Sequence, residues 1–410
     1  MLDFLCSMSA ARRRVLLLVI IYAGFISLGL PDTVLGVAWQ KMRLDFGSPV
    51  SYAGFFTFLL CCFSTVSSLS SGYILRRFGT GRLLAVCGLA TGLALVGCGL
   101  AGAFWIMLLM AVPLGFGQGA VDTGMNHYVA KHYTSRDMNW LHCCWGVGAS
   151  AGPGLMTVII AGGCSWRYGY WIIGAVQIML ALVFAFTLPL WRGDGGSDGT
   201  ATDAFQSGEK VEKDYRFWCC PAMFFLYTGI EAGMGLWGYM FLTSCRGVDG
   251  TLAGYAVTGY WCCLTAGRFL IGFLANRLGN IRQQRFSMIG AFLCGLLMLV
   301  PQSGIAATGF VLCGFMFASF YPAMMHMAPE RFNAFTAATV IGFQGGGGTL
   351  GVAVIPALLG FAAGRMGFVL LPCWLLVSAL AVLGMGVAVD GVRGGKNRGR
   401  HAAVTADGRS

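Results

Sequence analysis

P-L-G-F-G-Q-G-A-V-D-T-G-M-N-H-Y-V-A-K-H, residues Pro113–His132, is the second half of a long apolar segment. Asp122 lies in its middle, and a carboxylate at that depth in a membrane helix costs about 2.5–3.5 kcal/mol or more. Gln118, Asp122 and Asn126 follow one another at intervals of one helical turn, so one helix face carries all three polar groups. A protonated carboxyl that only bonds a neighbouring helix is one interpretation of Asp122. The other, which we favour, is a polar site that lines a pathway through the bilayer.

The composition is that of a polytopic membrane protein. Hydrophobic residues make up 57% of the 410 residues, charged residues only 10%, and the mean hydropathy is +0.72. Soluble domains contain about 25% charged residues. The length suits about twelve spans of roughly 20 residues with short loops. We therefore predict an all-α membrane protein with twelve transmembrane helices.

The basic residues are distributed as a membrane topology requires. The formal net charge is +11, but no basic patch is joined to stacking aromatic residues outside the membrane segments, so we expect no nucleic-acid partner. Most Lys and Arg residues fall on one side of the predicted topology, and those on the opposite side are Lys41, Arg43, Arg167, Arg246 and Arg365. This bias predicts that both termini are cytoplasmic and that the protein is a multi-pass protein of the cell membrane.

The two halves of the sequence repeat each other. Gly72, Arg77 and Gly79, after the second predicted span, recur at one constant offset as Gly272, Arg277 and Gly279 after the eighth. Residues 191–215 between the halves are hydrophilic and rich in Gly, Asp, Ser and Lys, which is typical of a flexible linker. We predict a six-helix half over residues 1–190, a cytoplasmic linker over 191–215, a six-helix half over 216–390 and a disordered basic tail over 391–410.

Two more acidic residues are predicted inside membrane spans. Asp32 follows Pro31, which removes a backbone donor and is expected to kink the first span. Asp32 either caps the helical segment after this kink or partners Asp122. Glu231 lies in the seventh span, one turn after Tyr227, and either makes a single interhelical hydrogen bond or exchanges protons. We predict Asp32, Asp122 and Glu231 as the proton-coupling groups.

Amides, aromatic rings and a histidine in the spans have the chemistry to hold a polar solute. We predict substrate contacts from Gln118, Asn126, His142, Trp145, Tyr227, Trp237 and Gln344. A lone histidine near a helix end, such as His142, is also explained by a purely structural role. Gln344 precedes four consecutive glycines, which make that helix deformable. Arg77, Arg268 and Arg277 are predicted as gating or structural residues near the cytoplasmic ends of their spans.

The sequence contains no pattern of an enzyme or a metal site. Its 16 cysteines show no metal-ligand spacing, and several are adjacent pairs in apolar runs. Neighbours on a helix point about 100° apart, so such pairs do not readily share one site. We therefore expect no enzymatic activity, no metal and no cofactor.

Several of these motifs resemble those of a known family. The G-x-x-x-x-R-x-G pattern at residues 72–79, with its copy at 272–279, is similar to the cytoplasmic motif of the major facilitator superfamily, although Leu75-Arg76 stands where an acidic residue is common.

A narrower resemblance is to the fucose permease branch, the sugar–proton symporters. It rests on Asp32 ahead of Trp39-Gln40, Asp122-Thr-Gly-Met-Asn126, His142-x-x-Trp145-Gly146 and Tyr227-x-Gly229-x-Glu231. The resemblance implies an alternating-access fold in which Asp32 and Asp122 couple protons to substrate and Asn126 bonds the substrate. Asp122 is shorter than the glutamate of that branch, so identical coordination is not implied.

The function we expect is proton-coupled symport of a monosaccharide or a similar small polar solute. A carboxylate in a low dielectric favours its neutral form, so it can carry a proton, although the same groups leave sodium open as the coupling ion. The alternative is a drug/proton antiporter of the same fold, because Gly148-x-x-x-Gly152-Pro153 matches the first half of the antiporter motif of the fifth span. A membrane sensor that transports nothing is disfavoured, since no signalling domain is attached. The partners we expect are a small-molecule substrate, the proton and the lipid bilayer, and we expect a monomer.

Overall fold

The computed structural model describes residues 9–133, 135–191, 215–332 and 334–407. Within these ranges the chain is all-helical, without a strand. The first group of helices is α2 (Ala10–Asp45), α3 (Tyr52–Phe78), α4 (Thr80–Leu100), α5 (Phe104–His132), α6 (Ser135–Ala161) and α7 (Arg167–Phe186), followed by the short η1 (Leu188–Trp191). The second is α8 (Tyr215–Arg246), α9 (Gly250–Leu278), α10 (Asn280–Leu299), α11 (Ser303–Phe317), α12 (Phe320–Arg331), α13 (Ala334–Met366) and α14 (Leu370–Asp407).

The predicted all-α membrane fold is confirmed, and the number of spans is close to the prediction. Ten helical segments of the described chain are long and apolar enough to cross a membrane, and α11 and α12 together form one of them. Helices α9 and α10 are not among the ten, so the count of twelve stays a prediction. In α10, the first turns carry Arg282 and Arg285, which lower its apolar character.

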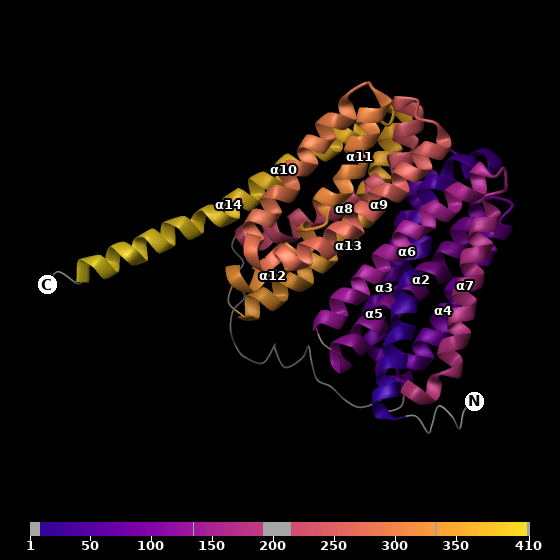
Figure 1. Cartoon of the computed structure of the whole chain (residues 1–410), viewed down its shortest axis with the longest axis horizontal. Coiled ribbons are helices and arrows are strands. Elements are labelled where there is room, and N and C mark those ends of the chain that lie inside the picture. The colour runs from indigo at the N-terminus through magenta and orange to yellow at the C-terminus, as the bar shows by residue number, and fades with distance from the viewer. Residues whose placement is uncertain (1–8, 134, 192–214, 333, 408–410) are drawn as a thin grey trace.

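The predicted boundaries of the halves remain predictions. Residues 192–214, which make up most of the predicted linker, lie outside the described residues. At the other end, α14 continues to Asp407, where the composition predicted a disordered tail from residue 391. Figure 1 shows this helical extension projecting from the bundle.

The two groups of helices repeat one packing arrangement. In the first, α2 packs on α6, α3 on α5, and α4 on α7; in the second, α8 packs on α13, α9 on α11, and α10 on α14. Each pair in the second group occupies the same positions in its half as the corresponding pair in the first, when α11 and α12 are counted as one span. The predicted motif glycines share their geometry as well, since Gly79 has φ +75° and Gly279 has φ +71°, a conformation that only glycine adopts freely. Two pseudo-symmetric six-helix halves therefore make up the described bundle (Figure 1).

Helices α2 and α6 approach each other closely enough to set the geometry of the site. A Cβ atom at Gly148 of α6 would overlap the carbonyl group of Ile26 on α2. Small residues permit such close approach of membrane helices, where packing replaces the hydrophobic effect. The consequence is that Trp145, less than one turn before Gly148, reaches the Asp32 carboxylate.

The halves touch each other through α6 with α9, α3 with α13, and α2 with α8. At the α2–α8 contact, a Cβ atom on Gly36 would lie 2.5 Å from the carbonyl oxygen of Gly235. Nearby, the Thr243 hydroxyl donates to the Gln40 side-chain oxygen over 3.4 Å. Figure 1 shows the halves leaning together at this end of the bundle, away from the N-terminus. The end opposite the N-terminus is therefore closed by direct helix contact.

Candidate functional site

Asp32 is held by side chains from two other helices. Its Oδ1 atom accepts a hydrogen bond from Gln118 Nε2 on α5 at 2.8 Å, and its Oδ2 atom accepts one from Trp145 Nε1 on α6, also at 2.8 Å. Helix α2 continues through Pro31 without a break, so Asp32 does not cap a separate helical segment. Its carboxylate bonds the side chains of Gln118 and Trp145 instead. Asp32 is nevertheless solvent-accessible. A fixed carboxylate that solvent can reach is suited to bind a proton or a substrate hydroxyl.

Asp122 forms a second acidic group beside the first. The amide of Asn126 donates to Asp122 Oδ1 at 3.1 Å and to the Asp122 carbonyl at 3.0 Å. Asp122 and Asp32 are close enough to interact electrostatically. Two acidic groups so near each other disfavour the state in which both are ionised. Of the face predicted from the spacing, Gln118 therefore bonds Asp32 directly, Asp122 interacts with it electrostatically, and Asn126 bonds Asp122.

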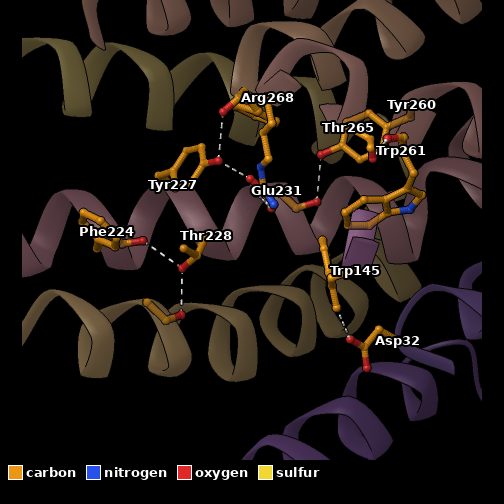
Figure 2. A network of polar contacts seen from close by, with 12 residues as sticks. Asp32, Trp145, Phe224, Tyr227, Thr228, Glu231, Tyr260, Trp261, Thr265 and Arg268 are labelled. Carbon is orange, nitrogen blue, oxygen red and sulfur yellow. Dashed lines mark hydrogen bonds and ion pairs between the residues drawn. The ribbon is translucent and has the colours of Figure 1, made fainter. Parts of the chain in front are cut away.

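The second half contributes an acidic and a basic group. Glu231 Oε1 on α8 lies 3.6 Å from Arg268 Nη2 on α9. Tyr227 donates its hydroxyl to Glu231 Oε2 and also lies 3.0 Å from the Phe317 carbonyl oxygen. The Tyr260 hydroxyl donates to the main-chain oxygen of Glu231 at 3.1 Å. Figure 2 shows this network converging on Glu231.

Trp145 joins the two halves of the site. Its indole nitrogen bonds Asp32, while the Arg268 guanidinium carbon lies 5.7 Å from the centre of the indole ring. This distance is within the range of a cation–π interaction. The ring of Trp261 on α9 stands edge-on to the same indole, with the ring centres 5.9 Å apart. A continuous series of contacts therefore runs from Asp32 through Trp145 to Arg268 and Glu231 (Figure 2).

The charges of this site do not balance. Asp32, Asp122 and Glu231 supply three carboxylates, and Arg268 supplies one guanidinium. Ionised carboxylates within a membrane are costly unless they are paired. Taking up protons or another cation is the direct way to neutralise the excess. The arrangement has the chemistry to take up a cation beside a polar molecule.

Of the other predicted site residues, His142 interacts electrostatically with Arg268, whereas Trp237 and Gln344 lie elsewhere. His142 is exposed and stands edge-on to Phe25, with ring centres 5.8 Å apart. Trp237 is fully buried and donates its indole N–H to the Pro356 carbonyl at 2.8 Å. Gln344 is also fully buried, and its amide has no partner among the described residues. The structure does not bring Trp237 and Gln344 into the network around Asp32 and Glu231, and their substrate roles stay predictions.

The predicted cytoplasmic arginines lie at the ends of α3 and α9. Arg77 is exposed, and its Nη1 atom donates to the Tyr73 hydroxyl at 3.1 Å. Arg277 falls in a stretch whose side chains lie outside the described part of the chain. Their gating role therefore stays a prediction.

Three aromatic residues of the site were not predicted. Tyr260 and Trp261 are adjacent on α9, and Tyr321 of α12 interacts electrostatically with Arg268, Asp122 and Glu231. Tyr321 comes directly after the break between α11 and α12. Its Phe-Tyr-Pro context at the end of a predicted span was a signal of irregular backbone, which membrane proteins place along cavities. The described residues contain no group of three or more His, Cys, Asp or Glu that could hold a metal ion.

The sequence and the fold of this chain are similar to those of known membrane transporters. A family profile described as Major Facilitator Superfamily matches residues 21–356. The cis,cis-muconate transport protein of Acinetobacter baylyi is 23% identical over 352 residues, which cover 80% of this chain and 83% of the relative. The glucose/mannose transporter GlcP of Bacillus subtilis is 25% identical over 240 residues, 55% of this chain and 58% of the relative. A crystal structure of a mutant nucleoside transporter NupG superimposes with a TM-score of 0.73 at 15% identity, covering 91% of this chain and 98% of that one.

Proposed function

The chain belongs to the Major Facilitator Superfamily and is a multi-pass membrane transporter, and we propose that it is a proton-coupled symporter of a monosaccharide or a similar small polar solute. The observation that carries this proposal is the solvent-accessible Asp32 carboxylate, which Gln118 and Trp145 hold from two other helices. The similarity to a glucose/mannose transporter supports a sugar. The motifs shared with the fucose permease branch support both the sugar and the proton.

The proposed cycle follows from the charge of the site. An incoming proton neutralises one of the carboxylates around Asp32, and the substrate hydroxyls bond the amides and carboxylates that remain. The lower charge reduces the cost of enclosing the site between the halves. Release of the proton on the other side restores the charge and prepares the return of the empty carrier. We assign proton coupling to Asp32, Asp122 and Glu231 on these grounds.

The orientation of this cycle rests on the distribution of basic residues. If both termini are cytoplasmic, the end closed by the α2–α8 contact is extracellular, and the conformation described here faces inward. We propose this orientation, a location in the plasma membrane and a monomeric carrier with two six-helix halves as the working unit.

Uptake by the reconstituted protein tests the proposal. Proteoliposomes with an imposed proton gradient, and separately a sodium gradient, are offered radiolabelled fucose, glucose and galactose. We expect one of these sugars or its close derivative to accumulate with the proton gradient and to leak out when the gradient is collapsed. Accumulation driven by sodium alone would reassign the coupling ion. Proton-driven extrusion of lipophilic cations, without uptake of any sugar or derivative, would favour drug/proton antiport instead.

Replacing Trp145 by Phe is expected to lower transport efficiency by about tenfold or more, because a hydrogen bond to a charged group contributes about 1.5–3 kcal/mol. The substitution keeps an aromatic face for Arg268 and removes the N–H group that fixes Asp32, together with one ring of the indole. The measurement is the initial uptake rate as a function of substrate concentration.

The matched control is Trp166→Phe. Trp166 Nε1 donates to Asp45 Oδ2 at 2.7 Å, so this change also removes an indole–carboxylate bond, but one outside the site. It is expected to leave transport efficiency within about twofold of the wild type, as for mutations that do not act through the site. Equal losses in the two variants would show that Trp145 has no special role.

A further inference from the structure

Arg268 is held near Glu231 without being fully engaged by it. The Nη2–Oε1 distance of 3.6 Å exceeds the roughly 2.7–2.9 Å of a charge-assisted hydrogen bond. The Nε atom of Arg268 is buried and finds no acceptor among the residues that the structure describes. Guanidinium donors in a membrane interior are expensive to leave unsatisfied. Arg268 thus retains donor capacity at the centre of the site.

The guanidinium as a whole remains reachable from the site, although its Nε atom is buried. The Arg268 side chain is 20% exposed and that of Glu231 is 13% exposed. The face of Trp145 holds the guanidinium in place, so it is oriented before any ligand arrives. A planar guanidinium with a fixed orientation matches a planar carboxylate, because its parallel donors meet two oxygens at once.

We propose that Arg268 docks a carboxylate group of the substrate, so that the solute carried is a sugar acid of the uronate or aldonate class rather than a neutral sugar. This inference rests on the proposed function and narrows its substrate. The two halves offer opposite chemistry: the first presents the Asp32 and Asp122 carboxylates, which accept hydrogen bonds from hydroxyl groups, and the second presents the Arg268 donors. A sugar acid has hydroxyls at one end and a carboxylate at the other, and so meets both.

Glu231 and the substrate carboxylate compete for the same guanidinium. The coupling proton, once the carboxylates around Asp32 have taken it up, passes to Glu231 Oε1 and removes this competitor, and Arg268 turns to the substrate. The proton leaves Glu231 when the substrate dissociates on the other side, and the Glu231–Arg268 pair forms again. One proton balances the charge of one substrate monoanion, so this exchange moves no net charge.

Among the described residues, Arg268 is the one cation that interacts with Glu231. The titratable groups that interact with Glu231 come from α8, α9, α11 and α12, and they are Tyr227, Tyr260, Arg268, Cys313 and Tyr321. Of the other helices packed on α8, α2 carries Asp32 in its middle, with Arg12, Arg13, Arg14 and Tyr22 before it and Lys41, Arg43 and Asp45 in its last two turns. Helix α13 contains only Arg365, in its last turn, and the described side chains of α14 include only Cys373 and Asp390. On α6, which packs on α9, His142 interacts with Arg268. Asp390 is paired with Arg331 at 2.8 Å. Arg268 is therefore the one described cation that Glu231 controls.

Matched pairs of substrates test this inference in proteoliposomes with a proton gradient. The pairs are D-glucose with D-glucuronate and D-galactose with D-galacturonate, each radiolabelled. We expect at least one acid to be taken up with a transport efficiency about tenfold or more above that of its neutral partner, because a charged hydrogen-bonded pair contributes more than the 1.4 kcal/mol that a tenfold ratio represents. Arg268→Gln should remove this preference, and Arg365→Gln, which changes an arginine packed on Phe361 away from the site, should preserve it.

The Glu231→Gln variant tests whether a proton on Glu231 frees Arg268 for the substrate carboxylate, or whether Arg268 simply attracts the negative charge. Binding of the acid to the purified full chain, measured by calorimetry, should strengthen from neutral to mildly acidic pH in the wild type. In Glu231→Gln the competitor is absent at every pH, so binding of the acid should be strong at neutral pH. The part of the pH dependence that comes from Glu231 should disappear, and the part that comes from Asp32 and Asp122 should remain. An unchanged pH dependence in the variant would overturn the exchange.

The outcomes distinguish this inference from the proposed function. Proton-driven accumulation of a neutral sugar, with its acid excluded, would overturn the inference and leave the symporter proposal standing. Absence of proton-driven accumulation for both members of every pair would overturn the two together. Because the wild-type protein alone gives these results, they do not depend on whether the Arg268 variant folds.

Discussion

Replacing Asp32 by Asn is expected to abolish proton-driven accumulation while exchange of labelled for unlabelled substrate continues. Asparagine keeps the size of the side chain and one acceptor oxygen for Gln118 or Trp145, but it does not take up and release protons. With a pH gradient of about two units, one proton per substrate supports an accumulation of about 100-fold. The variant should reach a ratio of about one, since no proton energy reaches the substrate. Accumulation ratio and counterflow rate, measured in the same proteoliposomes, check both parts.

Asp122→Asn and Asp45→Asn complete this experiment. Asp122 interacts with Asp32, so its substitution should reduce accumulation as well. Asp45 accepts a hydrogen bond from Trp166 outside the site, and Asp45→Asn is expected to accumulate substrate as the wild type does. Normal accumulation by both site variants would contradict the assignment of these carboxylates.

Replacing Gly36 by Val is expected to prevent the closure of the end of the bundle that lies away from the termini. The Cβ atom would lie 2.5 Å from the Gly235 carbonyl oxygen and 3.0 Å from that of Leu236, so α2 and α8 would have to separate. Overpacking of this kind costs about 1–3 kcal/mol. Because this cost applies only to the conformation in which this end is closed, it shifts the equilibrium from the closed toward the open conformation by about 5- to 150-fold. Transport should fall by a comparable factor, because every cycle passes through the closed state.

Hydrogen–deuterium exchange distinguishes this effect from general instability. Peptides from the ends of α2 and α8 that meet near Gly36 should exchange faster in Gly36→Val, while peptides from α4 and α7 should not change. Gly102→Val is the matched control, because a Cβ atom there has no neighbour within 4 Å. Unchanged exchange and transport in Gly36→Val would show that this contact does not hold the closed state.

The sequence was most informative where one physical rule decides the outcome. Apolar segments of span length, with the carboxylate of Asp122 in their midst, predicted a membrane fold with a polar site, and the helices confirm the fold. The repeat of Gly79 at Gly279 predicted two related halves, and both residues have the positive φ that explains the choice of glycine. The four-residue spacing of Gln118, Asp122 and Asn126 predicted their shared face, because that spacing returns to the same side of a helix.

Contacts between helices distant in sequence were not predictable in this way. Arg268 was interpreted as a gating residue, and its pairing with Glu231 was missed, although two residues of opposite charge in consecutive predicted spans are a usable signal. The position of Trp145 between Asp32 and Arg268 depends on how closely α6 approaches α2 and α9, which periodicity does not specify. The same limit applies to Trp237, which resembled a substrate-stacking residue in the sequence but bonds the Pro356 carbonyl within its own half.

The central claim is that substrate and proton move together, and the pH of a weakly buffered suspension tests it most directly. Proteoliposomes without any imposed gradient are mixed with an inward-directed gradient of the accumulated solute, and the external pH is recorded. The account predicts a substrate-dependent rise of external pH as protons enter with the solute, and no rise with Asp32→Asn. Entry of the solute without a pH change, or with acidification of the medium, would contradict proton symport.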